Sequence, residues 1–232
     1  MAGAAALAGV SVVAPTLGWM RPLSSWTADH HTGVGELRVL SFSPEVTVAM
    51  NTRSSLALQA DTTDLLGIEL IDGEIAVDID ESLRSVLVRA ASGQLVARNA
   101  HFEVRFLEDE VCISCLSGRL GVTLADNTQV VEAGRQLRYR GQHVRSIDSI
   151  AVSDLPQWRQ GIISFDGTTL SEVVREINRY RPGRLIVLGE SLQSLPVSGR
   201  FRVGDLDKAI AQISQLFRLD VKDLPGGVVV LS

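Results

Sequence analysis

The sequence predicts an all-β region of stacked short antiparallel strands, sandwich or solenoid-like, followed by a small α+β region and preceded by one apolar N-terminal helix. Three observations support this fold class. Short apolar runs between residues 28 and 150 are separated by turn residues roughly every eight to twelve positions. Apolar residues with helical spacing appear convincingly only after residue 158. The chain also begins with a stretch that carries no charge.

The N-terminal segment is nearly as long as a membrane span. Residues 2–20 contain no charged side chain, and the first charged residue of the chain is Arg21. The segment is interrupted by Pro15 and lacks the basic start of an ordinary secretory signal. We expect residues 1–21 to be the remnant of a single-pass transmembrane helix whose upstream part is missing from this sequence. An atypical export signal and a buried helix of a globular domain are the alternatives.

The second segment, residues 28–152, should be an all-β domain. One apolar face per strand favours antiparallel pairing. Turn signals include Asp72-Gly73, Ser92-Gly93 and Ser117-Gly118. The expected strands are Glu36–Phe42, Val46–Met50, Leu56–Gln59, Gly67–Ile71, Ile75–Ile79, Val86–Arg89, Leu95–Arg98, Phe102–Phe106, Val111–Leu116, Leu120–Leu124, Val130–Val131 and Gln136–Arg140.

The two cysteines form a C-x-x-C pattern, which suggests redox or metal chemistry. Cys112 and Cys115 lie within a predicted strand, where three residues separate Cα atoms by about 10 Å and point the side chains to opposite faces. That separation is too long for a disulfide. We interpret both as small strand residues.

The third segment, residues 158–232, should be a small α+β domain. Thr169 and Glu172 form a capping box for a helix that ends near Tyr180 and has an apolar stripe. A second helix starts at Asp205. The predicted order is β-α-β-β-α-β-β, with both helices against one small sheet. The expected strands are Ile162–Phe165, Arg184–Leu188, Pro196–Phe201, Leu219–Val221 and Val228–Leu231.

Charge and composition exclude several functions. A net charge of −5 argues against nucleic acid as the main partner. We predict no enzymatic activity, no metal and no cofactor, because no nucleophile, paired acid and base, or phosphate loop is found. The remaining polar groups have structural interpretations. We expect a solvated face or a protein contact for Arg175, Arg179, Arg181 and Arg184. The acidic clusters should be solvated turns; they are Asp72, Glu74, Asp78, Asp80 and Glu81. We expect His101 to be a surface or packed residue of a strand.

Several motifs, in order, resemble the periplasmic domain of FecR-family proteins, which are transmembrane sensors or anti-sigma regulators. They are T-G-V-G-E-L-R (residues 32–38), V-x-V-x-x-N-x-x-S-x-L (46–56), L-I-D-G-E-x-x-V (70–77), F-E-V (102–104) and L-S-G-R-L (116–120). Each is weak alone, whereas their order over about a hundred residues is fairly specific.

One departure from the family pattern concerns self-cleavage. Some FecR relatives cut themselves at a Gly-Thr pair, where the threonine hydroxyl attacks the preceding carbonyl. This chain has Asn99 and Ala100 there, and alanine has no nucleophile. The resemblance therefore implies that this position is inactive.

The third segment resembles the short N-terminal domain of secretins and TonB-dependent receptors, which closes many FecR-family proteins. Its motifs are W-x-x-G-x-x-x-F (158–165) and the helix ending in N-R-Y (169–180). The resemblance implies a single-pass protein of the bacterial inner membrane, with most of the chain in the periplasm. It would relay a signal from a siderophore-loaded TonB-dependent transducer to an extracytoplasmic-function (ECF) sigma factor, through a cytoplasmic segment absent from this sequence. The alternative is a non-enzymatic envelope binding or scaffold module with a FecR-like β domain.

A strand edge of the α+β segment is our candidate partner-binding surface, because an unpaired edge offers N–H and C=O groups to a partner strand. The candidate residues are Val197, Ser198, Gly199, Arg200 and Phe201, the last two being side-chain anchors. The alternative is that this strand pairs internally as a central strand.

Overall fold

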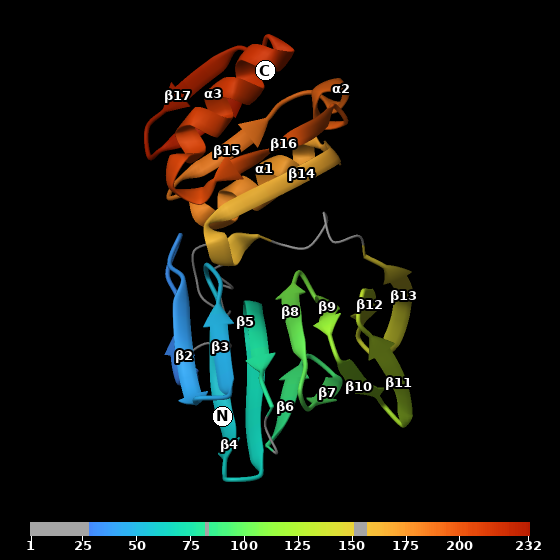
Figure 1. The fold of residues 1–232 in the computed structure, drawn as a ribbon. Helices are drawn as coiled ribbons and strands as arrows, with labels where there is room; N and C mark the ends of the chain where they lie inside the picture. The colour runs from blue at the N-terminus through green and yellow to red at the C-terminus, as the bar shows by residue number, and fades with distance from the viewer. Residues whose placement is uncertain (1–27, 82–83, 151–156) are drawn as a thin grey trace, which may run out of the picture.

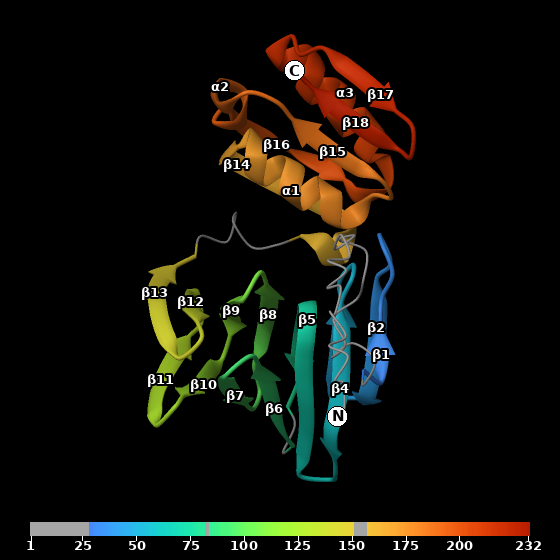
Figure 2. The same cartoon turned by 180° about the vertical axis from the view of Figure 1, so that it is seen from behind.

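The structure is a computed structural model that describes residues 28–81, 84–150 and 157–232. Figures 1 and 2 show two regions. We call the part built from β1 to β13 the sheet region and the part from the 3-10 helix η3 to β18 the C-terminal region. In both views the C-terminal region lies over the ends of β2, β3 and β5.

The sheet region is one large curled sheet of short strands. A path of paired strands runs β11-β10-β7-β6-β5-β8-β9-β12-β13, and β3 and β4 attach to β5, with β2 on β3 and β1 on β4. The strands are β1 (His30–His31), β2 (Arg38–Ser43), β3 (Val46–Met50), β4 (Ser55–Asp61), β5 (Leu65–Ile79), β6 (Ser85–Ala90), β7 (Gly93–Ala97), β8 (His101–Leu107), β9 (Glu110–Ser117), β10 (Arg119–Leu124), β11 (Asn127–Glu132), β12 (Arg135–Arg140) and β13 (His143–Ser149).

Strand β5 organises this sheet. It is 15 residues long, and its two halves have different neighbours. The first half pairs with β4 and β6, and the second half pairs with β3 and β8. The predicted turn at Asp72-Gly73 is wrong, because Gly73 adopts a φ of 99° and the strand continues through it. A Cβ at Gly73 would lie 2.4 Å from the hydroxyl oxygen of Ser54.

The alternation of apolar residues is confirmed as the source of the core. Inward-facing side chains such as Val48, Val77, Phe102 and Ile113 are fully or almost fully buried in one cluster. The prediction of antiparallel pairing holds for all pairs of this region except β5 and β6, which are parallel. Strands β1 and β13 were not predicted from the sequence.

The cysteine interpretation is confirmed. Both thiols are free on β9, with Cys115 in the core and Cys112 half-buried on the other face. Burial raises the pKa of each thiol to about 11. Neither cysteine therefore has the lowered pKa of a reactive thiolate.

The C-terminal region follows the predicted order of strands and helices. Its elements are η3 (Trp158–Gln160), β14 (Ile162–Thr169), α1 (Leu170–Tyr180), β15 (Arg184–Val187), the short α2 (Glu190–Gln193), β16 (Pro196–Arg202), η4 (Val203–Asp205), α3 (Leu206–Phe217), β17 (Val221–Leu224) and β18 (Val228–Leu231). The prediction of one small sheet is wrong. Strands β14 and β16 form one sheet, and β15, β18 and β17 form another, in that order.

Helix α1 begins as the capping box requires. The Thr169 hydroxyl accepts a hydrogen bond from the Glu172 amide, and the Glu172 carboxylate accepts one from the Thr169 amide. The apolar stripe is buried in a second core shared by both small sheets. Asn178 ties the helix to β15 by exchanging two hydrogen bonds with the backbone of Leu185.

Two predictions fall outside the described residues. These are the apolar segment 1–21 and the division between residues 152 and 158, most of which lies at positions 151–156. Among the helices that the structure describes, none has the length and hydropathy needed to cross a membrane.

Candidate functional site at the junction of the two regions

The C-terminal end of α1 contacts the sheet region through one buried arginine. Arg179 Nη2 donates to Glu74 Oε2 on β5 at 2.8 Å. Its Nη1 donates to Glu176 Oε1, one turn earlier, at 2.7 Å. Arg105 Nη2 on β8 donates to the other oxygen of Glu176 at 3.1 Å. A chain of alternating charges, Arg105–Glu176–Arg179–Glu74, therefore crosses between the regions, and we call it the Arg179 network.

The turn after β3 supplies the uncharged part of the same contact. Asn51 Nδ2 donates to Glu74 Oε2 at 2.8 Å and to the Tyr180 hydroxyl at 2.7 Å. Thr52 Oγ1 donates to the backbone oxygen of Arg179 at 3.0 Å. A Cβ at Gly35 would lie 3.1 Å from the backbone oxygen of Tyr180, so even alanine would require a small displacement there. Hydrogen bonds thus satisfy the end of α1 from the sheet region.

Arg179 and Glu74 form the most deeply buried ion pair of the Arg179 network. The side chains of Arg179 and Glu74 are 11% and 4% exposed. Burial alone would lower the pKa of the Arg179 guanidinium, but the carboxylates of Glu74 and Glu176 outweigh it and raise that pKa. Arg179 therefore stays charged at any physiological pH, and it stabilises the buried carboxylate of Glu74 and the partly buried carboxylate of Glu176.

A second contact lies at the entry to the C-terminal region, where η3 places Trp158 on the outer face of the sheet. The indole packs on Ala49 and Ala76, and all three residues are buried. These alanines are register partners on β3 and β5. Because their side chains are single methyl groups, the sheet has room for an indole at this point.

Arg159 fastens the same turn. Its guanidinium binds both carboxylate oxygens of Asp78 on β5, through Nη1 at 3.1 Å and through Nη2. The two ring nitrogens of His101 each lie 3.0 Å from a carboxylate oxygen, one of Asp78 and one of Asp80. Burial alone would raise the pKa of Asp78, but the hydrogen bonds from Arg159 and His101 outweigh it and hold that pKa below its ordinary value.

Glu103 lies beside Trp158 and has a different environment. It is 4% exposed and pairs in register with Ala76. Burial, and then the nearby charge of Glu74, raise its pKa to about 8. Its Oε2 and the Trp158 indole nitrogen are both buried without a hydrogen bond of ordinary geometry among the described residues.

The junction, meaning the Arg179 network together with the Trp158 contact, joins several motifs that looked separate in the sequence. Thr32 Oγ1 donates to the backbone oxygen of Asn51 at 2.5 Å, and the Ser54 amide donates to Thr32 Oγ1 at 2.8 Å. Ser54 Oγ in turn exchanges hydrogen bonds with the backbone of Glu74. The T-G-V-G-E, N-x-x-S, G-E and N-R-Y motifs therefore meet at one place.

Sequence reasoning missed this site. Helix α1 was interpreted as structural, Arg179 was expected in a solvated face or a protein contact, and Glu176 and Tyr180 were given no role. The interpretation of the acidic residues as solvated turns is wrong for Glu74 and Asp78, which pair with arginines of the C-terminal region. The spacing of Glu176 and Arg179 on one helix face was the available signal.

The predicted partner-binding residues lie on β16, which pairs only with β14 among the described strands. The alternative of a central strand is wrong. Val197 is buried in the core, and Phe201 packs inward with its ring centroid 6.0 Å from that of Phe165. Ser198 accepts a hydrogen bond from the Gly167 amide at 2.8 Å. Gly199 lies opposite Phe165 in the register.

Arg200 is the charged member of this set. It is exposed, and it makes no ion pair with the described part of the chain. The role of Phe201 as an anchor for a partner does not suit its place in the core, whereas Arg200 remains free for one. Binding at this strand stays a prediction.

The position of the family's self-cleavage pair is a tight turn. Asn99 has a φ of 44°, in the left-handed region that glycine adopts without strain. Ala100 is fully buried, and its backbone oxygen accepts a hydrogen bond from the Ile79 amide at 3.0 Å. The backbone thus has the conformation that suits glycine, but the side chain after it lacks a nucleophile.

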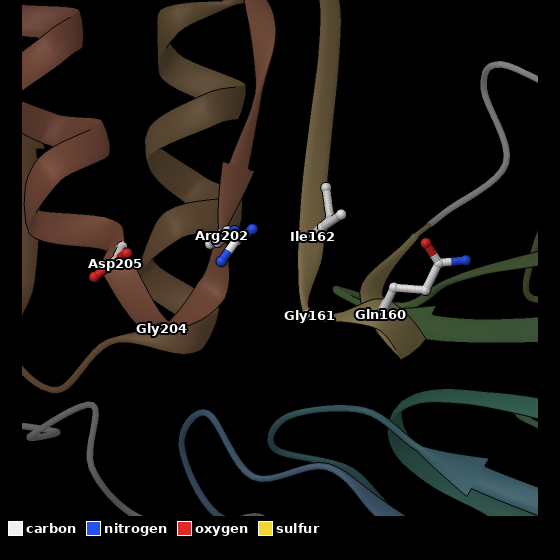
Figure 3. A pocket seen from close by; sticks show the side chains of 6 residues that line it. All are labelled: Gln160, Gly161, Ile162, Arg202, Gly204 and Asp205. Atoms are coloured by element: carbon white, nitrogen blue, oxygen red, sulfur yellow. The ribbon is translucent and has the colours of Figure 1, made fainter.

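An open hollow of about 390 Å³ lies beside η3, and Figure 3 shows the side chains that line it. It is lined by Gln160, Gly161, Ile162, Arg202, Gly204 and Asp205. Arg202 and Asp205 stand on its far side from Gln160, as the close view shows. Within the described ranges, no group of three or more histidine, cysteine or acidic side chains is arranged to hold a metal ion.

Comparison with known proteins agrees with the resemblance seen in the motifs. Residues 28–121 match the family model described as FecR protein. No curated protein is significantly similar to the chain in sequence. Two crystal structures of a candidate anti-sigma factor from Parabacteroides distasonis ATCC 8503 share the fold. One has a TM-score of 0.72 at 15% identity, covering 88% of this chain and 97% of the other. The second has a TM-score of 0.70 at 15% identity, covering 87% and 96%. The shared fold spans both regions, and residues 28–121 of this chain are a FecR domain.

Proposed function

We propose that this chain is a FecR-type signalling regulator that acts as an anti-sigma sensor of the bacterial envelope. In this proposal a single N-terminal span holds it in the inner membrane and the described residues lie in the periplasm. It relays the state of a siderophore-loaded TonB-dependent transducer to an ECF sigma factor. The FecR domain and the fold shared with a candidate anti-sigma factor support a signalling regulator.

The junction is the observation that best supports a relay. A signal received by the C-terminal region must reach the membrane-proximal start of the chain through the sheet region. The Arg179 network and the Trp158 contact bind the two regions with buried ion pairs and a buried indole. Because buried, paired charges hold one geometry, a displacement of the C-terminal region moves the sheet region with it.

The docking surface in this proposal is the free edge of β16. One edge of β16 pairs with β14, and the other has no strand neighbour among the described residues. The backbone groups of this free edge can pair with a strand of the transducer's signalling domain. Arg200 is exposed on that strand and supplies a charge that a partner carboxylate can pair with.

The test measures binding to the periplasmic signalling domain of a TonB-dependent receptor from the same genome. Arg200→Glu should abolish binding and leave thermal unfolding unchanged. Lys222→Glu on the exposed strand β17 is the matched control, because it makes the same charge reversal on another edge and should bind normally. Retained binding by Arg200→Glu removes β16 as the docking strand, and no binding by the unmodified chain removes the transducer as partner.

A further inference from the structure

Glu103 is a buried acid at the place where the C-terminal region enters the sheet. Its neighbours in register are Ala76 on β5 and Ser114 on β9, which are small and uncharged. Among the described residues, neither its Oε2 nor the indole nitrogen of Trp158 makes a hydrogen bond of ordinary geometry. An ionised carboxylate in such a site is strongly disfavoured, whereas a neutral carboxylic acid is tolerated.

The surrounding charges do not compensate Glu103. The charged and titratable groups around Glu103 lie on five elements. The acids are Glu74 and Asp78 on β5, and the arginines are Arg105 on β8, Arg138 on β12 and Arg159 on η3. The others are His101 on β8 and Cys112 on β9. The three arginines are engaged elsewhere.

Each of these arginines has a different carboxylate partner. Arg159 binds Asp78, Arg105 binds Glu176, and Arg138 lies 3.7 Å from Glu110. Glu103 therefore has acids nearby and no cation of its own. Its pKa of about 8 follows from burial first, then from the charge of Glu74, and Arg159 and the Trp158 indole oppose this shift without cancelling it.

We propose that the Trp158 contact is a proton-dependent latch: Glu103 is protonated while Trp158 is seated, and ionisation of Glu103 unseats Trp158 and loosens the junction. The proton passes to solvent, and the carboxylate left behind is hydrated only if the indole above it moves away. Because Trp158 is the first residue of the C-terminal region, its release frees the entry of that region from the sheet.

The sign follows from the direction of the shift. A carboxyl whose pKa is raised in the closed form binds its proton more tightly when the latch is closed. Closure is therefore most favourable below the ordinary pKa of glutamate and weakens as the pH rises towards 8. The Arg179 guanidinium keeps its charge over this pH range, because neighbouring carboxylates raise its pKa. The Arg179 network keeps the regions together while the latch opens.

The test uses Trp158 as its own reporter in the full chain. The other two tryptophans, Trp19 and Trp26, are replaced by phenylalanine. Acrylamide quenching and the emission maximum are then recorded from pH 5 to 9. Because Trp158 is buried, we expect weak quenching and short-wavelength emission at pH 5 to 6. Quenching and a red shift should then increase as the pH approaches and passes 8.

Glu103→Gln is the decisive variant, because the amide has the size of the protonated acid and cannot ionise. It should remain weakly quenched over the whole range. Glu110→Gln on β9 is the matched control and should keep the original profile, because that carboxyl is 37% exposed and lies beside Arg138. A flat profile in the reporter chain, or the same rise in Glu103→Gln, overturns the proposal. Circular dichroism at each pH separates unseating from global unfolding.

Discussion

Replacing Arg179 by methionine should destabilise the whole chain more than any other single change in the junction. The substitution keeps a long apolar stem and removes the cation. It leaves Glu74 buried and charged, with Asn51 Nδ2 as its remaining side-chain donor. Breaking a buried ion pair by removing one partner costs about 3–5 kcal/mol. At about 1.4 kcal/mol per factor of ten, this is a roughly 150- to 5,000-fold shift towards the unfolded state.

The assay is urea denaturation of the full chain followed by far-ultraviolet circular dichroism, with the free energy of unfolding extrapolated to water. Lys208→Met is the control. Its pair with Asp205 is 3.2 Å long, but the two side chains are 76% and 49% exposed, so removing it should cost about 0–1 kcal/mol. Adding Glu74→Gln to Arg179→Met should recover part of the loss, because the uncompensated charge disappears. A cost below about 1 kcal/mol for Arg179→Met, or a double variant as unstable as the sum of the two single variants, refutes this account of the junction.

Three further predictions concern the sheet region. Gly73→Ala should cost several kcal/mol in urea denaturation, because its φ is 99° and its Cβ position is occupied, whereas Gly134→Ala, with φ 77° and no atom within 4 Å, should cost only about 1 kcal/mol. Asp78→Asn should lower stability at neutral pH. The pKa of Asp78 is lowered in the folded state, so its contribution to stability is lost as the pH falls through that pKa. The difference in unfolding free energy between the variant and the unmodified chain should therefore shrink below about pH 4. A difference that stays constant would show that Asp78 is not an ion-pair partner. Intact mass after expression should equal that of the uncleaved chain, and a fragment beginning at Ala100 contradicts the assignment of the Asn99–Ala100 bond as inactive.

The sequence was most informative where one residue period sets the structure. Alternation in the sheet region placed Val48, Val77 and Phe102 in the core, and the capping box placed the start of α1 at Thr169. These features depend on residues close together in the chain. The same holds for the two cysteines, whose separation along one strand settles their faces.

The junction was out of reach for the opposite reason. Asn51 and Tyr180 are 129 positions apart, and Glu74 and Arg179 are 105 apart. A buried glutamate next to a turn signal reads as a surface residue until its partner is known. Gly73 had the same effect on β5, because a glycine after aspartate predicts a turn, whereas here it permits the close approach of Ser54 within a continuous strand. The two small sheets of the C-terminal region also depend on which strands meet, and local pattern does not contain that information.

The course of the large sheet has a practical consequence for anyone who wishes to transplant this domain. The FecR match ends at residue 121, inside β10. Strand β9 needs β12 as its outer neighbour, and β10 needs β11. A graft cut at residue 121 would divide β10 and remove β12 from β9. The unpaired N–H and C=O groups of the new edge strands could then pair with strands of other chains. The smallest part of the sheet that can be transplanted therefore extends through β13. Without the C-terminal region, Glu74 and Ala76, which are buried in the whole chain, would be exposed to solvent.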